Sequence, residues 1–185
     1  MTYTEAVKKA ISGDKEGWNF LCEETYKGCS HTALKMMGNK DDADDVLHDA
    51  YMRAFKALSQ LDNPEAFAGW MNRIVTTTAL NAINSQKKQP VNFSAMEEDK
   101  DGEEFNYEVE DTSTDTQPEL HYSKEETTML VNELLSVLND DQRAAIIANI
   151  YSGITTREIA ESLGISENTV KARIKQGKDK MQIKA

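Results

Sequence analysis

Residues 155–174, "TTREIAESLGISENTVKARI", predict two short helices joined by a tight turn. Thr155 and Glu158 make the pattern of a capping box, in which each side chain satisfies a backbone N–H group at the start of a helix. Gly164 allows the tight turn, and Ser166 is a suitable N-cap for the second helix. A short helix, a glycine turn and a capped second helix are typical of a helix-turn-helix.

The second helix of this stretch has an apolar and a polar face. The apolar face should pack against the first helix and comprises Val170, Ile174, Gly177 and Met181. The opposite face would meet base edges in the major groove and comprises Asn168, Lys171, Ala172 and Lys175. Phosphates would then lie near Arg173, Lys178 and Lys180. The alternative is a solvated basic face on an ordinary helical hairpin.

The acidic residues of the chain are concentrated in one segment. The formal net charge of the 185 residues is −11, and residues 97–119 alone hold 11 acidic residues against one lysine. This segment is poor in apolar residues, which predicts a flexible acidic linker over residues 89–122. Residues 165–185 carry six basic and two acidic residues. Since salt screens charges beyond about 8 Å, the acidic segment does not exclude phosphate contacts near the C-terminus.

The residues before this linker predict a compact helical domain, residues 1–88. Residues 41–58 place apolar side chains at helical spacing, namely Ala43, Val46, Leu47, Ala50, Tyr51, Ala54, Phe55 and Leu58. The opposite face of this helix carries Asp44, Asp45, His48, Asp49, Arg53 and Lys56. Further helices are expected over about 14–37 and 65–85, and Pro64 suits the first turn of the second of these.

The residues after the linker predict four short helices in a second domain, residues 123–185. The first has leucines at every fourth position, at Leu130, Leu134 and Leu138. The second begins with another capping-box pattern at Asn139, and Gly153 ends it. Its apolar residues are Ile146, Ile147, Ile150 and Tyr151. Because no strand alternation is sustained anywhere, the predicted fold is all-α, with two small helical domains and a C-terminal helix-turn-helix.

The sequence offers no pattern for a membrane span, a metal, a cofactor or an enzyme. There is no run of eighteen apolar residues and no apolar signal core at the N-terminus. Cys22, Cys29 and His31 supply three potential zinc ligands without a fourth, so no metal is expected. The two thiols favour a reducing, cytoplasmic location. Because the sequence contains no glycine-rich phosphate loop, nucleophile elbow or H-E-x-x-H motif, we expect neither an enzyme nor a cofactor.

Two blocks of the sequence resemble one family, the bacterial extracytoplasmic-function (ECF) sigma factors. "DDADDVLHDAYMRAF" resembles the family's core-polymerase-binding helix, and "FAGWMNRIV" resembles the helix after it. Residues 138–181 are similar, nearly throughout, to the family's promoter-reading C-terminal region. The resemblance implies a detachable subunit of bacterial core RNA polymerase, with no membrane insertion. Its N-terminal domain would bind polymerase and open the −10 promoter element, and its C-terminal domain would read the −35 element of the DNA.

The resemblance also implies three sets of contact residues. Core polymerase would contact Asp44, Asp45, His48, Asp49 and Arg53. The −10 DNA would contact Asn63, Phe67, Arg73, Thr77, Asn81, Asn84, Lys87 and Lys88. The −35 DNA would contact Ser166, Asn168, Thr169, Lys171, Ala172, Arg173, Lys175 and Gln176. Trp70 and Ile74 are instead expected in the core.

Some positions depart from the family's pattern. His48 stands where glutamine is common, and Thr77 stands near a common asparagine. Residues 84–86 are neutral where basic residues are common. This neutral row predicts that core polymerase supplies much of the affinity for promoter DNA.

Several alternatives stay open at this level. The linker either mimics nucleic acid in the RNA-exit channel of polymerase, as the family's linker does, or is a solubilising tether. An anti-sigma factor is a further partner that the resemblance allows. Two other functions compete: a helix-turn-helix transcriptional regulator with a sensing domain, and a degenerate sigma-like regulator that binds polymerase without initiating.

Overall fold

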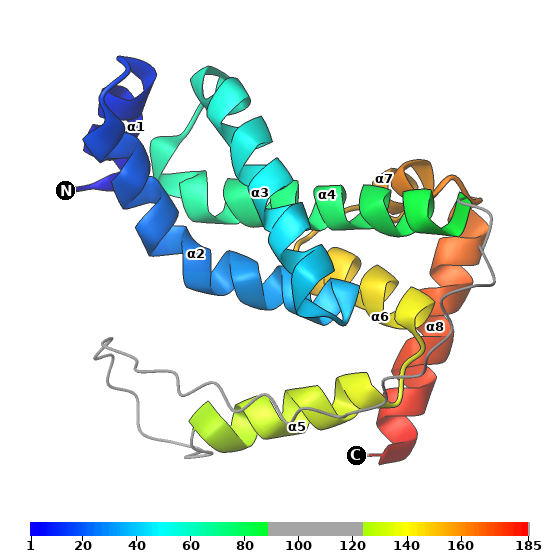
Figure 1. Cartoon of the computed structure of the whole chain (residues 1–185). Coiled ribbons are helices and arrows are strands. Elements are labelled where there is room, and N and C mark those ends of the chain that lie inside the picture. Colours follow the sequence, from blue (N-terminus) through cyan, green and yellow to red (C-terminus); the bar gives the residue numbers. More distant parts are fainter. Residues whose placement is uncertain (89–123, 185) are drawn as a thin grey trace.

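The computed structural model describes residues 1–88 and 124–184, with side chains from residue 129 to residue 182 in the second part. These residues form helices and no strand, which confirms the all-α prediction (Figure 1). The predicted linker, residues 89–122, lies outside the described residues, so its expected flexibility stays a prediction.

The N-terminal domain consists of four helices and two short 3₁₀ turns between the last two helices. The helices are α1 (Tyr3–Ile11), α2 (Lys15–Met37), α3 (Lys40–Ala57) and α4 (Phe67–Lys88), and the turns are η1 (Leu58–Gln60) and η2 (Pro64–Ala66). The first three helices each begin at a residue whose side chain accepts a backbone N–H bond: Thr2, Asp14 and Asn39. Such caps satisfy donors that the first helical turn leaves unpaired.

Helix α3 packs against α2 and α4, and the apolar stripe that its spacing predicted faces the core. Six of the eight residues in the stripe are buried, and Tyr51 is half-buried. Phe55 is a correction, because its side chain is 51% exposed. It lies at the edge of the stripe, where its ring meets the edge of Trp18 with the ring centroids 5.1 Å apart.

The C-terminal domain contains the four predicted helical segments. They are α5 (Lys124–Ser136), α6 (Asp140–Ile146) continued by a π-helical turn η3 (Ile147–Tyr151), α7 (Thr156–Leu163) and α8 (Glu167–Lys184). Both predicted capping boxes form, Asn139 with Gln142 and Thr155 with Glu158. Gly164 ends α7 with a left-handed φ of 64°, which is a conformation that glycine adopts without a Cβ clash.

The π-helical turn changes which residues after α6 are buried. Ile146 and Ile147 are buried as expected, but Ile150 and Tyr151 are 54% and 66% exposed. Ile150 and Tyr151 both lie within the π turn, which holds one residue more than an α turn, so an α-helical period does not predict which of its residues face the core. The predicted leucine stripe of residues 123–138 is also buried only in part, since Leu138 is buried and Leu130 is exposed.

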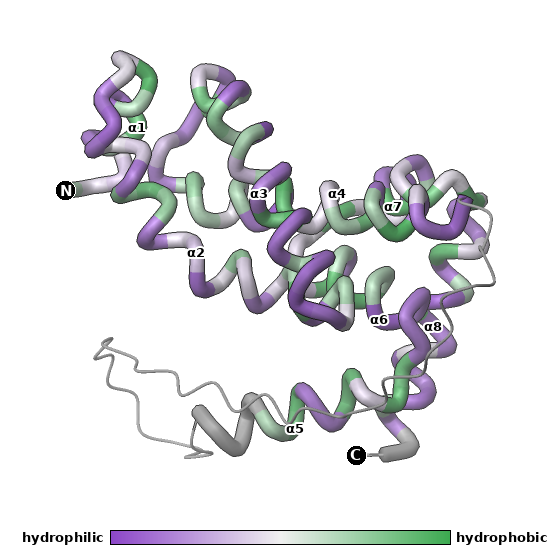
Figure 2. Tube along the Cα trace, viewed as in Figure 1, coloured by the Kyte–Doolittle hydropathy of each residue, from purple (hydrophilic) through white to green (hydrophobic). Residues whose placement is uncertain are grey.

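The two domains pack against each other, which the sequence did not predict. Helix α7 lies along the C-terminal half of α4, and α6 lies against α2 (Figure 1). Buried apolar residues of both domains form one continuous cluster. Hydrophilic residues dominate the N-terminal half of α3 and the middle of α8, which are two of the three helices with predicted binding residues (Figure 2).

Candidate nucleic-acid interface

Helix α8 presents the predicted base-reading face to solvent. The exposed side chains are those of Ser166, Asn168, Thr169, Lys171, Ala172, Lys175 and Gln176. The Ser166 hydroxyl accepts a hydrogen bond from the Thr169 N–H at 3.1 Å, so Ser166 caps the helix as predicted. A capped helix N-terminus with an exposed polar face has the geometry of a recognition helix.

The opposite face of α8 anchors it. Val170 and Ile174 are buried with Ile159, Ala160 and Leu163 of α7, which confirms the predicted packing. Gly177 lies instead against the α6 side of the domain, where an added Cβ would come within 2.4 Å of Ile146 Cδ1. Helix α8 is therefore held along its length by two different helices.

Two cations of α8 have carboxylate partners. Lys171 Nζ lies 2.8 Å from a carboxylate oxygen of Glu167, one turn earlier. The hydrogen bond from Lys171, together with one from the Thr156 hydroxyl, lowers the pKa of Glu167. Arg173, a predicted phosphate contact, forms an ion pair with Asp141 of α6 at 2.8 Å.

The predicted polymerase-binding face of α3 is also exposed. Asp44, Asp45, His48, Asp49 and Arg53 all reach solvent. An open groove of about 630 Å³ runs between this face and α4. Its lining includes four of these five residues, all except Asp44, together with Asn81 of the predicted −10 set.

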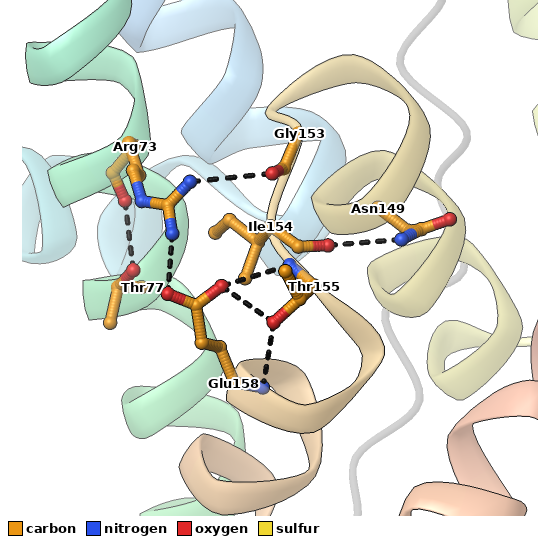
Figure 3. Close-up of polar contacts among 7 residues, drawn as sticks. All are labelled: Arg73, Thr77, Asn149, Gly153, Ile154, Thr155 and Glu158. Carbon is orange, nitrogen blue, oxygen red and sulfur yellow. Dashed lines mark hydrogen bonds and ion pairs between the residues drawn. The ribbon is translucent and has the colours of Figure 1, made fainter.

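The polar row of α4 faces the C-terminal domain in part. Arg73 donates hydrogen bonds to a Glu158 carboxylate oxygen at 2.5 Å and to the Gly153 carbonyl at 3.3 Å (Figure 3). Asn84 donates to the Ser162 carbonyl at 2.9 Å, and Lys87 pairs with Asp141. Three predicted DNA contacts are thus engaged by the second domain.

Glu158 accepts hydrogen bonds from both domains. Its carboxylate accepts hydrogen bonds from the hydroxyl and the backbone N–H of Thr155 and from the guanidinium of Arg73 (Figure 3). The Thr155 hydroxyl, the Thr155 N–H and then Arg73 lower the pKa of Glu158 to about 2. Asn149 holds the preceding loop by donating to the Ile154 carbonyl at 3.0 Å.

Phe67 is a correction among the predicted −10 residues. Its side chain is 0% exposed, and its ring stacks on that of Tyr3 from α1 at a centroid distance of 6.2 Å. A buried ring offers no surface to an unstacked base, so Phe67 is a core residue here. Asn63 is exposed and accepts the Glu65 N–H at 3.1 Å, which caps the turn before α4. Trp70 is half-buried and packs against the core.

A partly buried polar network between the domains was not predicted from the sequence. The Thr32 hydroxyl donates to the side-chain amide oxygen of Asn72 at 2.9 Å, and the amide nitrogen of Asn72 donates to the Ser152 hydroxyl at 3.1 Å. The hydroxyls of Thr76 and Ser152 lie 2.7 Å apart. Thr76 follows Val75 on the buried side of α4, and its position in the helical period was the available signal.

The described residues contain no group of three side chains suited to hold a metal ion. Cys22 and Cys29 are free thiols, and burial raises the pKa of each to about 11. No helix in the described part of the chain combines the length and apolarity that crossing a membrane requires.

Comparisons with known proteins match both domains separately. The family described as "Sigma-70 region 2" matches residues 23–89, and that described as "Sigma-70, region 4" matches residues 128–181. The ECF RNA polymerase sigma-E factor of Haemophilus influenzae is 24% identical over 184 residues, which is 100% of this chain and 95% of that protein. The RNA polymerase sigma-H factor of Pseudomonas aeruginosa is 24% identical over 92% of this chain and 86% of that protein.

One solved structure with a similar chain is the sigma factor RpoE in complex with the anti-sigma factor NepR from Bartonella quintana. The RpoE chain is 20% identical to this chain. The match covers 87% of this chain and 91% of the RpoE chain, with a TM-score of 0.46.

Proposed function

This chain is an ECF sigma factor of the sigma-70 family, and from that membership we propose how its residues divide the work of transcription initiation. It is not an enzyme itself. It binds core RNA polymerase and promoter DNA. What we propose is the assignment of faces and residues to each of these partners.

The acidic face of α3 is the proposed contact with core polymerase. Asp44, Asp45 and Asp49 are exposed on it and repel DNA, so a basic protein surface is the better match. His48 and Arg53 add donors on the same face, beside the groove toward α4. This assignment uses the N-terminal domain as the anchor on polymerase.

The −10 element is assigned to the turn before α4 and to the polar row of that helix. Opening DNA requires that an unstacked base be held on the protein, which costs a few kcal/mol. With Phe67 buried, Asn63 is the remaining candidate in the turn. Thr77, Asn81 and Lys88 are candidates along the helix, and Arg73, Asn84 and Lys87 join them when they are released from the C-terminal domain.

The −35 element is assigned to α8. The single observation that carries this assignment is the exposure of Asn168, Lys171, Ala172 and Lys175 on a helix whose opposite face is buried. Lysine and asparagine side chains read guanine and adenine edges in the major groove. Ser166, Thr169, Arg173 and Gln176 would add phosphate contacts and flanking polar contacts.

We place this activity in the cytoplasm, where polymerase and the chromosome lie. An anti-sigma factor is a proposed further partner, as the resemblance to the ECF sigma factors allows. For the linker we keep two proposals, a nucleic-acid mimic in the RNA-exit channel and a tether. Neutralising its acids between Glu97 and Asp111 should alter abortive initiation only under the first.

Co-elution and DNA binding test the assignment together. The purified chain should co-elute with core polymerase, and the complex should bind promoter DNA far more tightly than the free chain does. Tight and specific promoter binding by the free chain, without co-elution, would support a helix-turn-helix regulator instead.

A further inference from the structure

The first turn of α6 holds one row of side chains on α8. Arg173, Gln176 and Lys180 follow one another at spacings of three and four residues, so they lie on the same side of the helix. Asp141 lies 2.8 Å from the Arg173 guanidinium. Gln142 donates a hydrogen bond to the side-chain oxygen of Gln176 at 3.4 Å and accepts one from Lys180 Nζ at 3.0 Å. This row, between the proposed base-reading face and the buried face, is therefore held by two neighbouring residues of α6.

Gln142 is a buried amide whose orientation is fixed by its partners. The residue is only 4% exposed. Its Oε1 atom accepts hydrogen bonds from the Asn139 N–H at 3.4 Å and from Lys180 Nζ at 3.0 Å. A backbone N–H and an ammonium group can only donate, so the oxygen of Gln142 must face them and its nitrogen must face Gln176. The opposite orientation would bury the amide nitrogen against two other donors, which is costly.

The orientation of Gln142 decides that of Gln176. Because Gln142 Nε2 can only donate, Gln176 must supply its oxygen, Oε1, to this hydrogen bond. The two N–H donors of the Gln176 amide lie on the other branch of the side chain, and the residue is exposed. A glutamine that reads adenine uses its oxygen and its nitrogen together. Since the oxygen of Gln176 is engaged by Gln142, the amide suits a partner that only accepts, such as a phosphate oxygen.

We infer that Gln142 is a positioning residue for DNA binding, which turns the Gln176 amide so that its nitrogen donates to a phosphate beside the −35 element. The inference rests on the proposed function, because it uses the surface of α8 that is assigned to that element. Gln142 itself is buried and does not contact DNA. Gln176 lies beside the face that holds Asn168 and Lys175 and not at its centre, which places it toward the DNA backbone at the flank of the helix.

Gln142→Glu is the substitution that reverses the Gln176 amide. The carboxylate still accepts from the Asn139 N–H and from Lys180, and glutamate at this position keeps the capping-box pattern at the start of α6. A carboxylate cannot donate to Gln176, so the Gln176 amide should turn its nitrogen inward and present its oxygen to DNA. Gln176→Ala removes the amide altogether, and a protein with both substitutions completes a double-mutant cycle.

The affinity of each of the four proteins for promoter duplex, in complex with core polymerase, is measured by competition binding. Gln142→Glu should weaken binding by about tenfold when Gln176 is present, but by less than about threefold in the Gln176→Ala background. The second value isolates the effect of the added negative charge on DNA binding, which does not depend on Gln176. Equal effects of Gln142→Glu in the two backgrounds would overturn the inference.

The same measurement with substituted −35 elements separates phosphate from base contacts. Gln176→Ala should weaken binding by about threefold to tenfold on every −35 sequence, because a phosphate contact carries no base information. A loss confined to one base pair of the element would assign Gln176 to a base edge and would also overturn the inference.

Gln142→Leu provides a second variant without a new charge. It leaves the Gln176 amide able to rotate, so binding should weaken by about twofold to threefold with Gln176 present and should not change in the Gln176→Ala background. Urea unfolding of every variant checks that the domain is folded. An unaltered complex that binds promoters equally well with an intact and a scrambled −35 element would contradict the proposed function, whereas additive effects in a complex that does select this element would contradict only the role of Gln142.

Discussion

The hydroxyl oxygens of Thr76 and Ser152, 76 residues apart in the chain, lie 2.7 Å apart at the interface between the two domains. Thr76 also donates to the Asn72 carbonyl in its own helix, so its hydroxyl joins α4 to the segment that follows η3. Because Thr76 is fully buried, this contact is sensitive to the loss of a single oxygen atom.

Thr76→Val should lower the free energy of unfolding by about 1 kcal/mol, because it keeps the side-chain shape and leaves the Ser152 hydroxyl short of a partner. Thr78→Val is the matched control, since Thr78 is also buried but donates only to the Ile74 carbonyl of its own helix. Urea unfolding of both variants measures the difference. Equal losses would show that the bond to Ser152 adds nothing.

Glu158→Gln should lower stability at neutral pH, because the amide keeps the geometry of the capping box but loses the charge that faces Arg73. The pKa of Glu158 is lowered to about 2 in the folded chain from the ordinary value of 4.5 for a glutamate side chain. A lowered pKa stabilises the fold above 4.5, and this contribution is lost as the pH falls toward 2. Urea midpoints measured from pH 7 to pH 2 should therefore converge for the two proteins, and a constant gap would contradict the assignment.

Gly17→Ala and Gly28→Ala should change stability in opposite directions. A Cβ at Gly17 in α2 would lie 2.5 Å from the Ala6 carbonyl oxygen and 2.7 Å from the Ala10 nitrogen, which are backbone atoms of α1, and overpacking of this kind costs about 1–3 kcal/mol. A Cβ at Gly28 in α2 meets nothing within 4 Å, and alanine there should stabilise the helix by up to about 1 kcal/mol. Thermal unfolding measures both, and stabilisation by Gly17→Ala would show that α2 does not pack on α1 as described.

Lys171→Ala and Lys175→Ala should each weaken use of the −35 element by about 1–3 kcal/mol if these side chains contact bases. Lys15→Ala, at an exposed lysine of α2, controls for the loss of one positive charge. Competition binding of the polymerase complex to promoter variants is the measurement. A uniform loss across all −35 sequences would assign the two lysines to phosphates and not to bases.

Combining Asp45→Ala with Asp49→Ala should weaken the binding of core polymerase by about tenfold, because both carboxylates are exposed on the proposed docking face. Replacing Glu23 and Glu24 of α2 by alanine removes the same charge from another exposed surface. The affinity for core polymerase, measured for both double variants at two salt concentrations, distinguishes the two surfaces. Equal weakening by both would indicate a general charge effect and no dedicated face.

Local features of this fold could be predicted because their signals lie within a few residues. The capping boxes at Asn139 and Thr155 fall where the sequence placed them, and Gly164 makes the expected turn. The alternation of buried and exposed positions along α8 was predictable for the same reason, since it follows the helical period. These features define the helix-turn-helix and the exposed face that the proposed −35 contacts use.

Features that depend on distant residues could not be predicted. Phe67 is buried because Tyr3 from α1 stacks on it, and nothing near Phe67 in the sequence reports that partner. The exposure of Ile150 and Tyr151 follows from a π turn, which the apolar period does not reveal. Asp141 lies more than fifty residues from Lys87 in the chain, so their pairing required the three-dimensional arrangement.

Run-off transcription by purified core polymerase over a library of promoter fragments tests the central claim most directly. The account predicts transcripts that appear only when this chain is added and that share one −10 and one −35 element at a common spacing. An absence of chain-dependent transcripts, from a chain that co-elutes with core polymerase, would contradict it.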